Sequence, residues 1–129
     1  MIILHFGGDY MFKNIYSSIY DDEYYMKFSF DCPYDLVVQA IINSPNNLQF
    51  ISVEEGADVS LGYYGGDYSV EDFKKLITKN QIYPDSLYFH FDDVLIKLSY
   101  VKDIVTVTTK NQNFDLNEFI IEKKSEKSL

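Results

Sequence analysis

The sequence predicts an α+β fold, in which a mostly antiparallel sheet of about six strands carries three or four helices on one face. A β-meander followed by a helix is expected at the C-terminal end. The chain has 129 residues, 47% of them hydrophobic and 24% charged, which is typical of a single globular domain. Segments whose apolar residues alternate, as in strands, are interspersed with segments whose apolar residues have helical spacing, which indicates a mixture of strands and helices. Finally, three alternating segments between residues 87 and 109 are joined by turns so short that only antiparallel hairpins fit them.

The N-terminal part is expected to contain a strand, a helix and a second strand. The apolar run at residues 2–6 predicts a strand that ends at Gly7-Gly8-Asp9. Residues 11–20 predict an amphipathic helix, because their apolar side chains follow the i, i+3, i+4, i+7 spacing of one helical face. These side chains are Phe12, Ile15, Tyr16 and Ile19. Asp21-Asp22 should end this helix, and the alternation in residues 24–30 predicts the second strand.

Two further helices and two strands are expected in the middle of the chain. Asp31 precedes Pro33 as a capping residue, so a helix should begin there and stop at residues 43–45. Its expected inward-facing residues are Leu36, Val37, Ala40 and Ile41. Residues 48–53 predict a strand and 54–58 a turn, and alternation at residues 59, 61 and 63 predicts another strand. Ser69-Val-Glu-Asp72 resembles a capping box ahead of an apolar stripe at residues 73, 76 and 77, which predicts a helix.

The last third predicts the meander and the closing helix. Strands are expected at residues 87–91, 94–100 and 104–109, separated by Asp92-Asp93 and Lys102-Asp103. Asn113 is expected to cap a helix from residue 114 to about residue 123. The domain should span residues 1–124, with residues 125–129 as a frayed tail.

The charge restricts the classes of partner. All 11 basic residues are lysines, against 20 acidic residues, which gives a net charge of −9 and a pI of about 4.5. Nucleic acid and anionic membrane surfaces would repel such a chain, which also lacks the arginine that usually contacts phosphate. A basic protein or a metal cation is therefore the partner that the charge favours, although solubility alone also explains an acidic surface. Residues 1–60 hold two lysines and nine acids, so most of the negative charge lies in the N-terminal half.

The same sequence gives little support for catalysis, metal binding or membrane insertion. Its histidines, His5 and His90, each lie in an apolar strand, and Cys32 lies ahead of a helix, where a lone cysteine is usually a small buried residue. Metal-binding motifs and phosphate-binding glycine loops are missing, so no catalytic residue, metal or cofactor is predicted. No apolar run is long enough to span a membrane, and the N-terminus lacks the basic flank of a signal peptide. The single cysteine favours a reducing compartment, so we expect a cytoplasmic protein.

The candidate site is a surface that combines carboxylates with tyrosines. The chain contains 12 Tyr and 10 Phe but no Trp, and so many phenols cannot all be buried with their hydroxyls satisfied. Two stretches concentrate both residue types, and tyrosine is enriched at protein interfaces. The predicted partner-binding residues are Asp21, Asp22, Glu23, Tyr24, Tyr25, Tyr63, Tyr64, Asp67, Tyr68, Glu71 and Asp72. The alternative for each is a core tyrosine or a merely solvated acid, and an AT-rich genome would also enrich the chain in Tyr, Ile, Asn and Lys.

Three functional hypotheses follow. The first is a small acidic protein without enzymatic activity that inhibits a basic protein, as an immunity or antitoxin protein does when it covers the cationic site of a toxin or nuclease. The second is a small-molecule-binding or minor enzymatic α+β domain, whose mark would be a deep aromatic-lined cavity of roughly 300 Å³ or more. The third is a structural subunit that forms a homodimer through an exposed sheet edge. A monomer and a homodimer are both compatible with the sequence.

Overall fold

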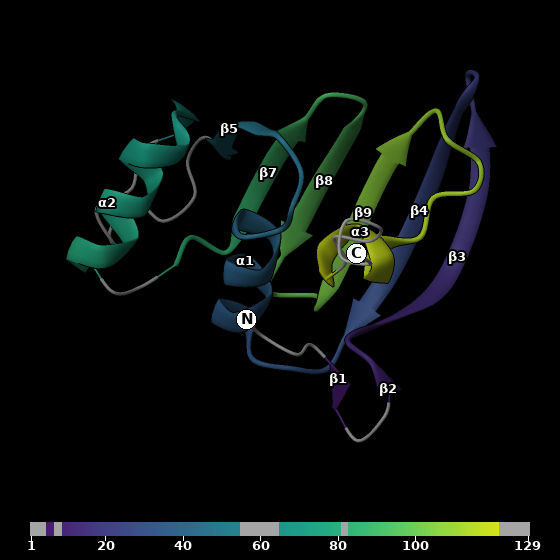
Figure 1. Ribbon diagram of the computed structural model, residues 1–129, viewed down its shortest axis with the longest axis horizontal. Coiled ribbons are helices and arrows are strands. Elements are labelled where there is room, and N and C mark those ends of the chain that lie inside the picture. The colour runs from purple at the N-terminus through teal and green to yellow at the C-terminus, as the bar shows by residue number, and fades with distance from the viewer. Residues whose placement is uncertain (1–4, 7–8, 55–64, 81–82, 122–129) are drawn as a thin grey trace, which may run out of the picture.

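A computed structural model describes residues 5–6, 9–54, 65–80 and 83–121. These residues form a seven-stranded antiparallel sheet, a separate two-stranded ribbon and three helices (Figure 1). The predicted α+β class is therefore confirmed, with one strand more in the main sheet than expected. The expected strand at residues 59–63 and the expected frayed tail lie outside the described residues.

The main sheet has the strand order β3-β4-β9-β8-β7-β5-β6, and every neighbouring pair is antiparallel. The predicted meander is confirmed as β7-β8-β9. The strands are β1 (His5–Phe6), β2 (Asp9–Tyr10), β3 (Phe12–Tyr20), β4 (Glu23–Phe30), β5 (Leu48–Val53), β6 (Gly66–Tyr68), β7 (Ser86–Phe91), β8 (Val94–Ser99) and β9 (Ile104–Thr109). The helices are α1 (Tyr34–Ile42), α2 (Val70–Asn80) and α3 (Leu116–Ile121).

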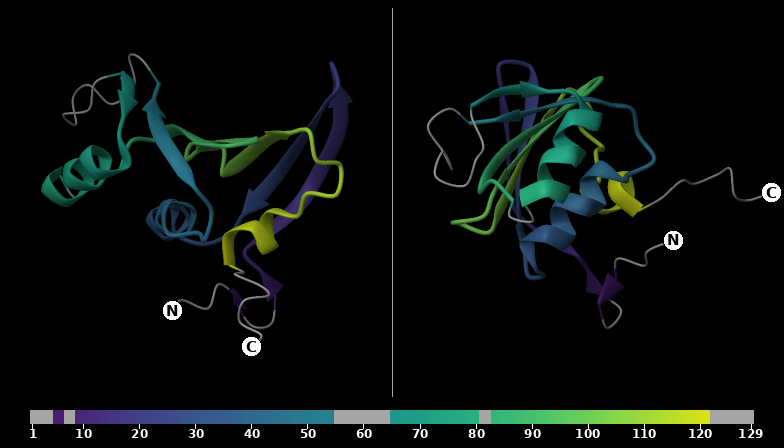
Figure 2. Two further views of the ribbon diagram at one scale, coloured as in Figure 1. Left: turned by 45° about the horizontal axis from the view of Figure 1, so that its top comes forward. Right: turned by 90° about the vertical axis from the view of Figure 1, so that its left-hand side faces the viewer.

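The core lies between one face of this sheet and the helices. Helices α1 and α3 lie on that face, and α2 packs at the end of the sheet formed by β5 and β6 (Figures 1 and 2). Alternate strand residues such as Phe89 and Ile96 are fully buried there, together with Phe73 of α2 and Leu116 of α3. Burying one such side chain contributes about 1.5–3 kcal/mol, so these contacts fix the helices to the sheet. The opposite face, which we call the open face, carries half-buried polar and aromatic side chains.

The predicted helix at residues 11–20 is wrong, because this segment is strand β3. Of the four apolar residues in the predicted stripe, Phe12 is buried, whereas Ile15, Tyr16 and Ile19 are exposed instead of facing the core. Seven of the nine residues of β3 are β-branched, aromatic or serine, and only Lys13 among the nine is a strong helix former. Pairing with β4 across a two-residue turn decides the outcome, since Tyr20 lies directly opposite Glu23.

Smaller differences concern helix ends and the first strand. Pro33, with no side-chain cap, precedes α1 in place of a capping Asp31, and Leu36 is exposed instead of facing inward. Asp115 replaces the expected cap Asn113, because its Oδ1 accepts a hydrogen bond from the N–H of Asn117 at 3.0 Å. The Ser69 cap is confirmed, since the N–H of Asp72 donates to its Oγ at 3.1 Å. Of the first predicted strand the structure describes β1, which pairs with β2 in the ribbon.

Candidate functional site

The two predicted acid–tyrosine stretches lie at opposite edges of the sheet. Asp21, Asp22 and Glu23 lie at the β3–β4 turn, whereas Asp67 lies on β6 and Glu71 and Asp72 begin α2. Strands β9, β8, β7 and β5 separate β4 from β6, which is about 24 Å at roughly 4.8 Å per strand. One small partner surface therefore cannot be centred on both stretches. Tyr63 and Tyr64 lie outside the described residues.

The predicted tyrosines divide between the two faces of the sheet. Tyr24 and Tyr68 are half-buried and pack against the core, and the Tyr68 ring lies 6.5 Å from that of Phe73. Tyr25 is directly opposite Thr108 and belongs to the open face. Tyr24 and Tyr68 therefore have a structural role, which the sequence left open as the alternative.

The fold adds a second acidic turn to the first. Thr109 of β9 pairs with Tyr24 on one side and with Val94 on the other, so the turns preceding β4 and β8 lie at the same end of the sheet. A groove of about 350 Å³ at this end is lined by residues that include Glu23, Asp92, Asp93 and Lys110. We call Asp21, Asp22, Glu23, Asp92 and Asp93 the acidic end. The sequence predicts Asp92-Asp93 as a turn but does not place it beside Glu23, because their proximity depends on strand order.

The β3–β4 turn itself has an unusual sequence. Asp21 has φ of 49° and Asp22 has φ of 65°, which is the left-handed backbone that a type I′ turn requires at both central residues. Asn-Gly is the preferred sequence for such a turn, because a side chain at positive φ is strained. Two adjacent aspartates followed by Glu23 add like-charge repulsion to this strain.

We expect the double change Asp21→Asn with Asp22→Gly to stabilise the protein by about 1 kcal/mol, because it relieves both the backbone strain and the repulsion. The midpoint of thermal unfolding should rise by about 4 °C for a chain of this length. Calorimetry of the wild type and the variant measures the shift. An unchanged or lower midpoint would show that the turn is not strained.

The strand leading into this turn carries an apolar surface that the sequence analysis did not place. Among the described residues, seven large hydrophobic side chains are exposed, and four of them lie on β3. We call these four the β3 surface: Ile15 (53% exposed), Tyr16 (50%), Ile19 (65%) and Tyr20 (72%). The apolar spacing predicts Ile15, Tyr16 and Ile19 on the buried side of a helix, although an acidic pair flanked by Tyr and Ile also fits a hairpin turn. Tyr16 and Tyr20 lie on the open face and Ile19 on the helix side of this edge strand, and the β3 surface adjoins the acidic end where Tyr20 is followed by Asp21.

A serine, a histidine and an aspartate lie together on the open face. Ser52 Oγ donates to Asp67 Oδ1 at 2.7 Å, and His90 Nε2 lies 3.0 Å from the same hydroxyl. The serine proton is directed to the carboxylate, so His90 acts as the donor to Ser52 and not as its base. The order of a hydrolytic triad is different, with histidine between serine and carboxylate.

The surroundings of His90 also favour a neutral ring. Phe50 stacks on the imidazole at 4.0 Å, and burial lowers the pKa of His90, an effect that Asp67 partly opposes. This cluster can therefore brace β5, β6 and β7 against one another. It does not present an activated nucleophile.

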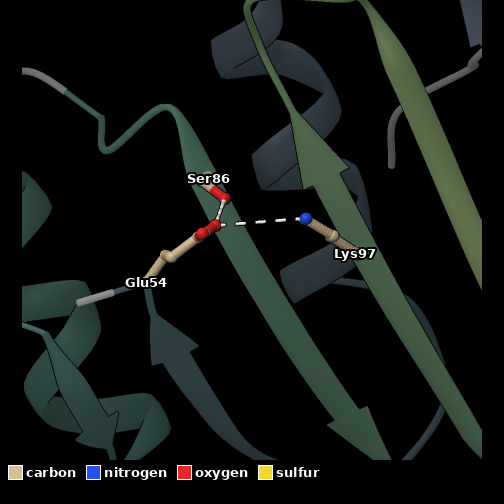
Figure 3. Close-up of polar contacts among 3 residues, drawn as sticks. All are labelled: Glu54, Ser86 and Lys97. Atoms are coloured by element: carbon tan, nitrogen blue, oxygen red, sulfur yellow. Dashed lines mark hydrogen bonds and ion pairs between the residues drawn. The ribbon is translucent and has the colours of Figure 1, made fainter. Parts of the chain in front are cut away.

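The two lysines at the centre of the open face are engaged by neighbouring side chains. Lys97 Nζ lies 4.0 Å from Glu54 Oε1, which also accepts a hydrogen bond from Ser86 Oγ at 2.5 Å (Figure 3). The same ammonium group lies 5.3 Å from the centre of the Tyr88 ring, and Lys27 Nζ lies 6.0 Å from that of Tyr16. Each contact contributes at most about 1 kcal/mol at the surface, but together they reduce the positive charge that this face offers to a partner.

Cys32 lies in the loop between β4 and α1, at the opposite end of the sheet from His90. Burial, followed by the charges of Asp31 and Asp35, raises the pKa of Cys32 to about 11. A catalytic cysteine needs the opposite shift, because the thiolate is the nucleophile.

We therefore expect the folded protein to react with iodoacetamide at pH 8 at least about tenfold more slowly than an ordinary thiol. The loss of thiolate is only partly offset by the greater nucleophilicity of a more basic sulfur. Mass spectrometry of timed samples measures the rate. The same protein in concentrated denaturant serves as the control, and equal rates in the folded and unfolded states would contradict the expectation.

Within the described part of the chain, no three side chains of His, Cys, Asp or Glu are grouped so that they could hold a metal ion. Nor does any helix in these residues have the length and apolar character needed to cross a membrane. Comparisons with family models, curated proteins and solved structures found no match to this chain.

Proposed function

We propose that this protein binds a basic protein and inhibits it, in the manner of an immunity or antitoxin protein that covers a cationic site. The observation that carries the proposal is the continuity of the β3 surface with the acidic end. Four exposed apolar side chains lead directly into a turn with three successive carboxylates, Asp21, Asp22 and Glu23. Large apolar residues supply the desolvated anchors of protein interfaces, and charges at the rim steer the partner and fix its orientation.

The alternative of a small-molecule site receives less support. Such sites are concave and mostly apolar, with a few polar groups directed inward. The groove at the acidic end exceeds 300 Å³, but it is open to solvent and is lined by Glu23, Asp92, Asp93 and Lys110. Its chemistry suits the rim of a protein interface better than the enclosure of an aromatic ligand. We place the inhibitor in the cytoplasm, since its one cysteine leaves no internal disulfide to form.

The test is retention of a partner by immobilised protein from a lysate of the source organism at about 50 mM salt, where charge attraction is weakly screened. Wild-type protein is compared with Asp21→Asn/Asp22→Asn/Glu23→Gln. The matched control, Asp67→Asn/Glu71→Gln/Asp72→Asn, removes the same charge at the other edge of the sheet. We expect a basic protein to bind the wild type and the control and to be lost from the first variant. Identical sets of proteins on all three columns would refute the proposal.

A further inference from the structure

We infer that the partner supplies an extended segment that adds to the sheet as an eighth strand, antiparallel to β3. This inference rests on the proposed function, because it specifies how the basic partner is held. Strand β3 is an outermost strand of the main sheet (Figure 1), so one side of its backbone has no neighbouring strand among the described residues. Peptide segments bind such edges through main-chain hydrogen bonds, and their alternate side chains give specificity.

The backbone groups that point outward follow from the register. Tyr20 and Glu23 flank a two-residue turn, so they exchange both of their hydrogen bonds with each other. Hydrogen-bonded and non-hydrogen-bonded pairs alternate along an antiparallel ladder. Ile19, opposite Tyr24, and Ser17, opposite Met26, therefore direct their N–H and C=O groups away from β4. An added strand can form four main-chain hydrogen bonds with these two residues.

The rest of this edge is already closed. The N–H of Phe12 donates to Asn117 Oδ1 at 3.1 Å, and Asn117 Nδ2 donates to the carbonyl oxygen of Phe12 at 3.0 Å, so this side chain from α3 occupies the place of a neighbouring strand. A bulge interrupts the ladder between Asn14 and Tyr16, where Asn14 Oδ1 accepts the N–H of Tyr16 at 3.1 Å. The opposite edge strand, β6, has only three residues. Short edges, bulges and covering groups are the usual protection against unwanted pairing. In the described part of the chain, the backbone of residues 17–20 has none of them, and Asn14 Nδ2 donates only to the side-chain hydroxyl of Ser17, at 3.2 Å.

The chemistry of the added strand follows from what surrounds this stretch. Tyr16 and Tyr20 lie beside this stretch on the open face, and Ile19 lies on the helix side. The residues of the added strand that face these side chains should therefore be apolar or β-branched. The acidic turn at Asp21-Asp22 adjoins the C-terminal end of β3, which is next to the N-terminal end of an antiparallel segment. Lysine or arginine is expected there. A second copy of this chain would bring another net charge of −9, so a basic segment is the occupant that charge complementarity favours.

The probe is the peptide acetyl-Lys-Lys-Val-Thr-Val-Thr-Val-amide, and acetyl-Glu-Glu-Val-Thr-Val-Thr-Val-amide is its charge-reversed control. We expect the lysine peptide, added at about 2 mM, to slow amide hydrogen exchange of Ser17 and Ile19 at least fivefold in NMR spectra, since both N–H groups become hydrogen-bonded. The control peptide should leave both rates unchanged. No protection by the lysine peptide, or protection confined to other strands, would overturn the inference.

Proline variants separate the backbone contact from the charge. Ile19→Pro removes an outward N–H without removing a bond to β4, and edge strands tolerate proline at such positions. Ile19→Pro should weaken peptide binding at least tenfold. If circular dichroism shows that Ile19→Pro does not fold, Ser17→Pro replaces it as the test variant, with the same expected loss of binding. Binding that survives both changes but is lost in Asp21→Asn/Asp22→Asn/Glu23→Gln overturns strand addition and leaves the proposed function standing. A wild-type dimer in light scattering that Ile19→Pro dissociates would instead assign this edge to a second copy.

Discussion

We expect the triple change Asp21→Asn/Asp22→Asn/Glu23→Gln to slow association with the proposed basic partner by about 10- to 100-fold at about 50 mM salt. Attraction between opposite charges steers two proteins together before contact, and these three carboxylates adjoin the β3 surface. Asp92 and Asp93 remain at the acidic end in this variant, so part of the attraction is retained. Association rates of the partner, measured by stopped-flow fluorescence for the wild type and the variant, give the size of the effect.

Salt provides the internal check on this prediction. The screening length falls from about 10 Å at 0.1 M salt to about 3 Å at 1 M, so the two association rates should converge at high salt. The control Asp67→Asn/Glu71→Gln/Asp72→Asn has the same net charge but should lose less than about threefold in rate. A wild-type rate that does not depend on salt would remove charge steering from the mechanism.

We expect the same carboxylates to link stability to the proposed function. If Asp21 and Asp22 are kept at strained positions for binding, the variant Asp21→Asn/Asp22→Gly should be more stable and yet bind the partner more weakly. A loss of affinity together with a gain of stability is not expected for acids that only keep the surface solvated. The two measurements on one variant therefore separate a binding role from the solubility that the sequence alone could also explain.

The sequence predicted those elements whose signals are local. The strands of the meander alternate clearly, with Ile96 and Leu98 buried on β8, and their turns are short enough to impose antiparallel pairing. The prediction for residues 11–20 was wrong because the apolar residues there fit the spacing of a helix: Phe12, Ile15, Tyr16 and Ile19. Their conformation is decided by pairing with β4, which the spacing does not reveal. Propensity alone pointed to a strand at Ile15 and Tyr16, and the apolar spacing was given too much weight.

The sequence predicts which types of residue form the candidate site, but not where the fold places them. Acidic residues near tyrosines are evident at residues 20–25, yet their proximity to Asp92-Asp93 depends on β4 and β8 both pairing with β9. The separation of Asp67 from this end depends in the same way on strand order, to which one sequence gives no direct access. Nor could Asn117 be assigned to Phe12, since the two residues are 105 positions apart.

The contact between Asn117 and Phe12 should be the most sensitive polar contact of this edge. Phe12 is buried, at 3% exposure, and Asn117 satisfies both of its outward backbone groups. Asn117→Ala leaves a buried N–H and a buried C=O without partners, and each such loss costs about 1–3 kcal/mol. We expect the free energy of unfolding to fall by about 2–4 kcal/mol, and the midpoint of thermal unfolding by about 7–15 °C. Urea unfolding followed by circular dichroism measures the first quantity and calorimetry the second.

Two further variants test the cause. Asn117→Asp keeps an acceptor for the N–H of Phe12 but places a charged oxygen against its carbonyl oxygen, so at pH 7 it should be no more stable than Asn117→Ala. Asn113→Ala, on the exposed loop before α3, should change stability by less than about 0.5 kcal/mol. Asn117→Ala also exposes the outward N–H and C=O of Phe12 on this edge strand. The alanine variant should therefore self-associate at concentrations where the wild type does not. Equal stability of Asn117→Ala and the wild type would mean that water replaces the amide, and that the edge at Phe12 is as open as the edge at Ile19.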